Sequence, residues 1–103
     1  MNLNTPEIED LLRTIRLLQT QKDAKAFFRD LLTEKEILEL SMRWKAAQML
    51  AQNIPYTQIQ QQTGLSSTTV ARISKWVFSG MNGYKKMITR ISHTHPSAKK
   101  VRS

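Results

Sequence analysis

The sequence contains no cysteine, and only three glycines and three prolines among its 103 residues. The lack of cysteine excludes disulfide bonds and thiolate metal sites, and it suits a reducing cytoplasm. No run approaches the ~20 apolar residues that a membrane-spanning helix needs. The N-terminal stretch MNLNTPEIED is polar and acidic, unlike a signal peptide. From these absences we expect a cytoplasmic protein.

Acidic residues are missing from most of the chain. All eight lie at or before Glu39, together with six Lys or Arg, whereas the chain from Leu40 onward contains ten Lys or Arg and no acid. The formal net charge of +8 therefore comes from one half of the sequence. A cationic half without compensating acid is typical of proteins that bind polyanions, and we interpret the partner as nucleic acid. The alternative is a generally basic protein with a solvated C-terminus.

Apolar residues make up 40% of the chain and recur at helical spacing, while no segment reads convincingly as a strand. We therefore predict an all-α fold. Pro6 is expected to open the first helix after Asn4 or Thr5. Asp23 is expected to cap a second, shorter helix.

A long helix is predicted to begin at Thr33 and Glu36, which have the spacing of a capping box, and to end at about Gln52. Its apolar residues fall on two faces, formed by Ile37, Leu40, Trp44 and Ala47 and by Leu38, Met42, Met49 and Leu50. Such a helix usually lies between other helices, within the domain or across a dimer. Because the chain is long enough for only a modest core, we expect a homodimer.

The stretch TGLSSTTVARI, residues 63–73, joins two helical segments through a glycine and is rich in short hydroxyl side chains. Gly64 has the position of a left-handed residue that ends a helix, and Ser66 or Ser67 is expected to cap the next helix. The inward-facing anchors are Ile59, Leu65, Val70 and Ile73. This pattern predicts a helix-turn-helix over about residues 56–79. The alternative is an ordinary helical hairpin with a polar outer face.

Short hydroxyl side chains allow a helix to approach base edges in the major groove of double-stranded DNA. We expect Ser67, Thr68 and Ala71 to face bases. Arg72 and Lys75 are expected to face mainly phosphate. The predicted DNA-binding residues are Tyr56, Thr57, Gln60, Ser66, Ser67, Thr68, Thr69, Ala71, Arg72 and Lys75.

The segments LTEKEILELSMRWKAAQML and YTQIQQQTGLSSTTVARISKW resemble the Trp repressor family, and in particular its TrpR-like branch labelled YerC/YecD. The resemblance covers about residues 32–86, including the closing SGMNGYKKM. Its most specific parts are Leu32, Thr33, Glu36, Arg43, the Gly64 turn and the run from Ser66 to Ile73. Gln60, where many other helix-turn-helix proteins have alanine, also fits this family. The resemblance implies an all-α, intertwined homodimer that binds a palindromic operator with two reading heads.

The resemblance also implies a possible effector pocket. In the Trp repressor, residues that match Thr33, Arg43 and Arg72 hold the tryptophan corepressor. The ligand-binding member has glycine at the position of Ile73 and serine at the position of Trp76. Ile73 should therefore fill the space that the indole needs, and Trp76 would close it further. We expect that L-tryptophan is not the effector.

Other chemistry finds little support in the sequence. No candidate nucleophile is accompanied by a histidine and an acidic residue at the spacing of a catalytic triad. The sequence contains no phosphate-binding loop, and its basic half contains no pair of carboxylates. We therefore predict that the protein is not an enzyme. His93 and His95 provide two metal ligands without a third, which makes a poor metal site. We predict no metal and no cofactor.

The predicted organisation is a single helical domain over residues 1–91 and a flexible basic tail over residues 92–103. Lys99, Lys100 and Arg102 in this tail either contact phosphate or are solvated. Three functions stay open: a sequence-specific transcriptional regulator, which we favour and which would be a repressor; a nonspecific architectural DNA binder; and an antitoxin-like dimer that binds another protein.

Overall fold

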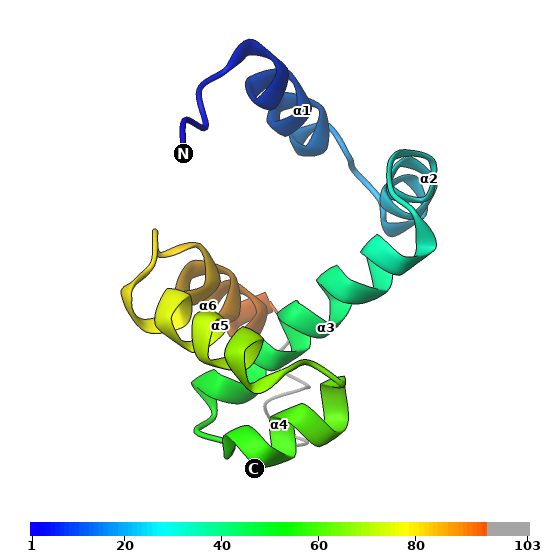
Figure 1. Ribbon diagram of the computed structural model, residues 1–103. Helices are drawn as coiled ribbons and strands as arrows, with labels where there is room; N and C mark the ends of the chain where they lie inside the picture. The colour runs from blue at the N-terminus through cyan, green and yellow to red at the C-terminus, as the bar shows by residue number, and fades with distance from the viewer. Residues whose placement is uncertain (95–103) are drawn as a thin grey trace. The chain divides into compact units, whose positions relative to one another are not determined.

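The computed structural model describes residues 1–94 of the chain. Within these residues every regular secondary-structure element is an α-helix (Figure 1). The helices are α1 (Pro6–Arg16), α2 (Gln21–Leu31), α3 (Glu34–Ala51), α4 (Tyr56–Thr63), α5 (Ser67–Ser79) and α6 (Gly83–Thr94). The prediction of an all-α fold is confirmed. No helix in this part of the chain is both long and apolar enough to cross a membrane.

The chain divides into two compact units, Met1–Leu38 and the residues from Glu39 onward, and α3 contributes to both. In the first unit the Thr5 hydroxyl accepts a hydrogen bond from the Ile8 N–H at 3.3 Å and caps α1. Pro6 is the first residue of this helix, as the sequence predicted. Neither α1 nor α2 contains a buried residue. One domain over residues 1–91 stays a prediction.

The cap of α2 differs from the predicted one. Thr20, with an extended backbone, accepts a hydrogen bond from the Asp23 N–H at 3.0 Å, so Asp23 is the third residue of the helix and its cap prediction is wrong. The physical reason is that either residue type can cap a helix, and an acid is also favoured inside the first turn by the helix dipole.

The capping box at the start of α3 is confirmed. The Thr33 N–H donates to a Glu36 carboxylate oxygen at 2.9 Å, and the Glu36 N–H donates to the Thr33 hydroxyl at 3.1 Å. Two N–H groups that would lack partners at a helix start are thereby satisfied. The same contacts with Thr33, first through its backbone and then through its side chain, hold the pKa of Glu36 below its ordinary value.

The hydrophobic core of the second unit is built from α3, α4 and α5. Its buried residues are Ala46, Ala47, Met49, Leu50, Ile59, Val70, Ile73 and Val77. Only the C-terminal part of α3 is therefore buried, while Leu38 and Leu40 nearer its start are exposed. Trp44 is half-buried against this core.

Helix α6 closes the second unit. Tyr84 stacks on Trp44 of α3, with ring centroids 6.2 Å apart and ring planes inclined by 14°. The helix runs to Thr94, so residues 92–94, which the sequence analysis assigned to the flexible tail, belong to a helix. The predictions for His95, Lys99, Lys100 and Arg102 lie outside the described residues.

Candidate nucleic-acid interface

The turn between α4 and α5 is set by one left-handed residue. Gly64 has φ = 74° and its N–H donates to the Gln60 carbonyl at 2.8 Å, which closes α4. A Cβ at this position would meet no atom within 4 Å, so the backbone angle, and not lack of space, makes glycine suitable here. The structure thus bears out the turn that the sequence predicted at Gly64.

Thr63 fixes the same turn from the other side, a role that the residue pattern did not single out. Its hydroxyl donates to the Ile59 carbonyl at 2.7 Å and accepts from the Leu65 N–H at 3.2 Å. A threonine directly before the helix-ending glycine is the signal that could have revealed this role, because Thr hydroxyls readily bond nearby backbone groups.

Ser66 is the cap of α5. Its hydroxyl oxygen accepts from the Thr69 N–H at 3.1 Å, and the hydroxyl donates to the Thr69 side-chain oxygen at 2.9 Å. Ser66 and Thr69 were both predicted to bind DNA, and both hydroxyls are engaged within the chain. Their first contribution is therefore to hold the N-terminus of α5 in place. A helix N-terminus of this kind favours phosphate groups.

The inner faces of α4 and α5 meet in the core. Ile59, Val70 and Ile73 are at most 1% exposed, and half-buried Leu65 packs against the same cluster. Burial of each such aliphatic side chain contributes about 1.5–3 kcal/mol, so these contacts hold the crossing of the two helices. All four predicted anchors point inward.

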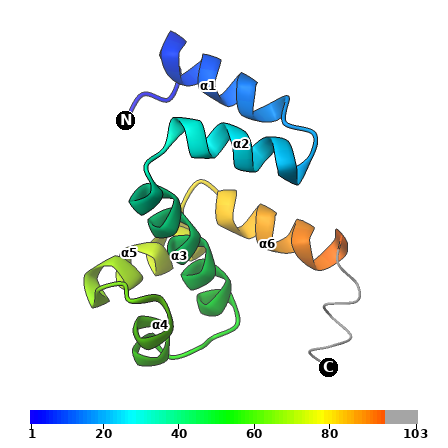
Figure 2. The same cartoon turned by 90° about the vertical axis from the view of Figure 1, so that its right-hand side faces the viewer.

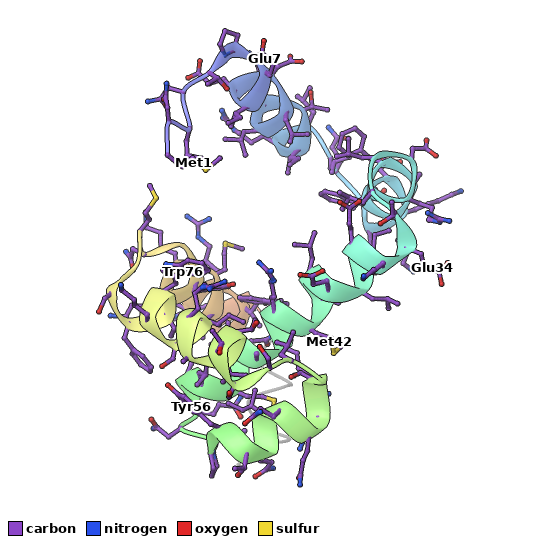
Figure 3. The ribbon with its side chains drawn as sticks, viewed as in Figure 1. Met1, Glu7, Glu34, Met42, Tyr56 and Trp76 are labelled. Carbon is purple, nitrogen blue, oxygen red and sulfur yellow. The ribbon has the colours of Figure 1, made fainter. Side chains whose placement is uncertain are left out.

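The outer face of α5 carries Ser67, Thr68, Ala71, Arg72 and Lys75, all exposed. On α4, Tyr56 and Thr57 are exposed and Gln60 is half-buried; Tyr56 stands at the start of that helix (Figure 3). Arg72 and Lys75 are the only charged residues of the two helices. The result is an exposed surface of small hydroxyl and methyl groups beside two cations, on the side of α5 that faces away from the core.

The acidic residue that is closest to α4 and α5 along the sequence already forms an ion pair. Glu39, the last acid of the chain, lies 2.9 Å from the Arg43 guanidinium one helical turn later on α3. No other carboxylate side chain in the second unit can neutralise Arg72 or Lys75, because the sequence contains none. Within the second unit the charge near α5 is therefore positive, which favours a phosphate backbone.

The residues of the predicted effector pocket have different surroundings. Thr33 belongs to the first unit, where its hydroxyl completes the capping box. Arg43 is paired with Glu39, although its Nε atom is buried without a hydrogen-bond partner. Ile73 is packed in the core, and Arg72 is exposed.

Trp76 belongs instead to an open apolar hollow. Its exposed fraction is 44%. The hollow is lined by Trp44, Trp76, Met81, Gly83, Tyr84 and Met87. Of the predicted pocket residues, only Trp76 lines this hollow. In the described part of the chain no three potential metal-ligating side chains come together.

The family model described as Trp repressor protein matches residues 6–92 of this sequence. The chain belongs to the Trp repressor family. This is a family of regulatory, non-enzymatic DNA-binding proteins, and the α4–α5 pair is its helix-turn-helix in this member. The resemblance that the sequence alone suggested is confirmed.

Three known proteins are similar to this chain. It is 30% identical to the uncharacterized protein YerC of Bacillus subtilis (strain 168) over 92 residues, which are 89% of this chain and 88% of YerC. A TrpR-like protein from Eubacterium eligens ATCC 27750 is 35% identical, with a TM-score of 0.82 over 86% of this chain and 92% of that one. A putative Trp repressor from Staphylococcus aureus is 30% identical, with a TM-score of 0.81 over 86% and 89%.

Proposed function

We propose that this member of the Trp repressor family is a sequence-specific transcriptional regulator that binds a palindromic operator as a homodimer. In this proposal Ser67, Thr68 and Ala71 face base edges and Arg72 and Lys75 face phosphates. A dimer seated on an operator excludes other proteins from the same DNA, so the expected regulatory effect is repression. Free tryptophan does not control it.

The observation that carries the proposal is the division of α5 into two faces. Val70, Ile73 and Val77 are buried, whereas the opposite face exposes short hydroxyl and methyl groups flanked by Arg72 and Lys75. A face of short side chains lets a helix enter the major groove closely enough to read base edges. Flanking cations fix the position of the helix on the phosphate backbone.

Exposed apolar side chains support a homodimer. The first unit and the start of α3 leave several large leucines exposed, namely Leu11, Leu12, Leu17, Leu31, Leu38 and Leu40. A single copy gives these helices no buried residue, so a second copy that covers the leucines would supply the missing apolar contacts. Two copies also provide two reading heads, which a palindromic operator requires.

The core position of Ile73 supports control without tryptophan. Ile73 is 1% exposed and packs in the buried cluster with Ile59, Val70 and Val77. Forcing additional carbons into a packed site costs about 1–3 kcal/mol, and an indole adds far more than one carbon. The Arg43 guanidinium is also occupied by Glu39, so an anionic ligand would have to compete with an internal carboxylate. A smaller anionic effector at Arg43 and Arg72 is compatible with this reasoning.

Selection of bound duplexes from random-sequence DNA tests the proposed function directly. The full-length protein should enrich a palindrome whose half-sites lie about one helical turn, ~34–36 Å, apart. As a matched pair, Arg72→Ala should reduce recovery of the palindrome, whereas Lys22→Ala on α2 should not.

Two other outcomes would favour the alternatives. Tight binding of all duplexes without enrichment would indicate an architectural DNA binder, for which the acid-free half of the chain is the favouring observation. No DNA binding at low salt would contradict both DNA-binding proposals and would favour the antitoxin-like dimer, whose partner would contact the acidic N-terminal half.

A further inference from the structure

The segment between α5 and α6 places an asparagine directly before a glycine. Residues 80–82 join the two helices (yellow in Figure 2), and Gly83 is the first residue of α6. Met81, Asn82 and Gly83 are all exposed, and Met81 reaches 85%. Asparagine is among the chemically labile residue types. Its side chain reacts with the backbone nitrogen of the residue that follows, and glycine obstructs that nitrogen least.

The backbone alone does not account for the order of these two residues. Asn82 has φ = 68°, a left-handed conformation that glycine adopts most easily and that asparagine tolerates. Gly83 lies outside this region of φ, and a Cβ on it would meet no atom within 4 Å. Glycine is also a poor helix former. The fold would therefore accept a larger residue at position 83, and the glycine there needs another explanation.

The two groups that would react are both unrestrained. Within residues 1–94 the side-chain amide of Asn82 has no hydrogen-bond partner, whereas its backbone carbonyl accepts from the Lys86 N–H at 3.1 Å. Because Gly83 is the first residue of α6, its N–H has no acceptor within the helix. Neither group has to give up a hydrogen bond before it reacts.

We propose that Asn82 is a site of spontaneous deamidation through a succinimide formed with the backbone nitrogen of Gly83. Hydroxide removes the proton of the Gly83 N–H, the nitrogen attacks Cγ of Asn82, and the side-chain amide leaves as ammonia with a proton taken from water. Water then opens the five-membered ring. Opening at Cγ gives aspartate, and opening at the backbone carbonyl gives isoaspartate.

Either product introduces a carboxylate into a part of the chain that has none. No Asp or Glu occurs after Glu39, and Asn82 lines a shallow hollow together with Lys85 and Lys86. Each converted copy therefore loses positive charge beside these lysines. Isoaspartate also adds one carbon to the main chain directly before α6, the helix whose Tyr84 stacks on Trp44. An effect on DNA affinity rests on the proposed function, whereas the modification does not.

An ageing experiment on the full-length folded protein tests the proposal. The protein is kept at neutral pH and physiological temperature, sampled over time, and digested with trypsin under mildly acidic conditions. Mass spectrometry then compares the peptide of residues 76–85, which contains Asn82, with the peptide of residues 46–72, which contains Asn53. Asn53 is a matched control, because it is also exposed and left-handed, with φ = 62°, but is followed by Ile54. Only the first peptide should gain the mass of an acid, partly as isoaspartate, at a rate that rises in proportion to the hydroxide concentration.

The decisive variant is Gly83→Ala. The added methyl group has room and favours the helix, so the circular dichroism spectrum should not change. Its crowding of the backbone nitrogen should slow the conversion of Asn82 at least about tenfold, which corresponds to about 1.4 kcal/mol in the activation barrier. Asn82→Asp serves as the charge standard. On a cation exchanger it should elute earlier than fresh wild-type protein and together with an aged fraction.

Several results would overturn the inference. Equal conversion of Asn82 and Asn53, or a Gly83→Ala variant that reacts as fast as the wild type, would contradict the role of Gly83. A product without isoaspartate would contradict the succinimide. Reaction of the urea-unfolded chain alone would show that the fold prevents the attack. All of these results leave the proposed DNA-binding function untouched, because none of them depends on DNA.

Discussion

Truncation of Ile73 separates the packing role of this residue from any role in ligand binding. Ile73 is 1% exposed and lies in the buried cluster with Ile59, Val70 and Val77. Ile73→Ala removes most of a fully buried aliphatic side chain and keeps a good helix former. Such truncations cost about 2–5 kcal/mol, through lost burial and the cavity left behind. Ile73→Gly would add about 1 kcal/mol from helix propensity alone, so alanine is the cleaner change.

Urea unfolding monitored by circular dichroism measures this loss. We expect the unfolding midpoint of Ile73→Ala to fall while the slope of the transition stays constant, since the surface exposed on unfolding changes little. Ile73→Val, which removes a single carbon, provides the graded control and should cost about 0.5–1.5 kcal/mol. Both variants keep the outer face of α5 unchanged, so any weaker operator binding should follow the loss of stability in the reading head.

Calorimetry with L-tryptophan completes the experiment. The wild-type protein should give no saturable heat at millimolar ligand, and its operator affinity should not change. Saturable binding that strengthens operator affinity at least tenfold, about 1.4 kcal/mol of coupling, would refute the reasoning and restore a corepressor model. A decrease of less than about 0.5 kcal/mol in the free energy of unfolding of Ile73→Ala would independently contradict the packing role of Ile73, because truncation of a residue that fills a packed core costs more than this.

Four further outcomes are expected. Thr68→Glu should abolish operator binding in a gel-shift assay without changing the circular dichroism spectrum, since it places a bulky anion on the exposed face; retained binding would remove Thr68 from the interface. Lys75→Ala should weaken all duplexes similarly and make the salt slope shallower by about one unit; a changed sequence preference would assign Lys75 to bases instead. The pKa of Glu36 is lowered in the folded state, so its ionised carboxylate stabilises the fold above the usual pKa of 4.5, and this contribution is lost as the pH falls below that value. Glu36→Gln should therefore weaken the dependence of the free energy of unfolding on pH in this acidic range. Light scattering should give twice the monomer mass, and a monomer at micromolar concentration would contradict the dimer.

Local signals in the sequence were sufficient for most helix ends. The capping box of Thr33 and Glu36 and the turn at Gly64 were predictable, because each satisfies a specific requirement of the backbone. The structure has both features at the predicted positions. Asp23 was predicted wrongly as a cap, because Thr20 is an equally good cap three residues earlier and only the backbone angles decide between them. The start of the tail was placed too early, since Ser92 and His93 are polar residues that a helix also accepts.

The site was less predictable than the fold. Spacing alone identifies which residues of α5 share its outer face, and this held for Thr68 and Lys75, which are both exposed. Spacing does not reveal which hydroxyls are engaged inside the chain, and the hydrogen bond from the Ser66 hydroxyl to the Thr69 hydroxyl is seen only in the structure. The burial of α3 likewise could not be read from its two apolar faces, because only the C-terminal part of the helix belongs to the buried cluster that also includes residues of α4 and α5.

The two tryptophans give the protein an internal pair of optical reporters. Trp44 is half-buried and stacked on Tyr84, so its emission should respond to separation of α6 from α3. Trp76 lies on α5, one turn after Arg72, and is 44% exposed, so its emission should respond when α5 docks on a ligand. Single Trp→Phe replacements would isolate each signal. Opening of the helical core and engagement of the recognition helix could then be followed as separate kinetic phases without any attached dye.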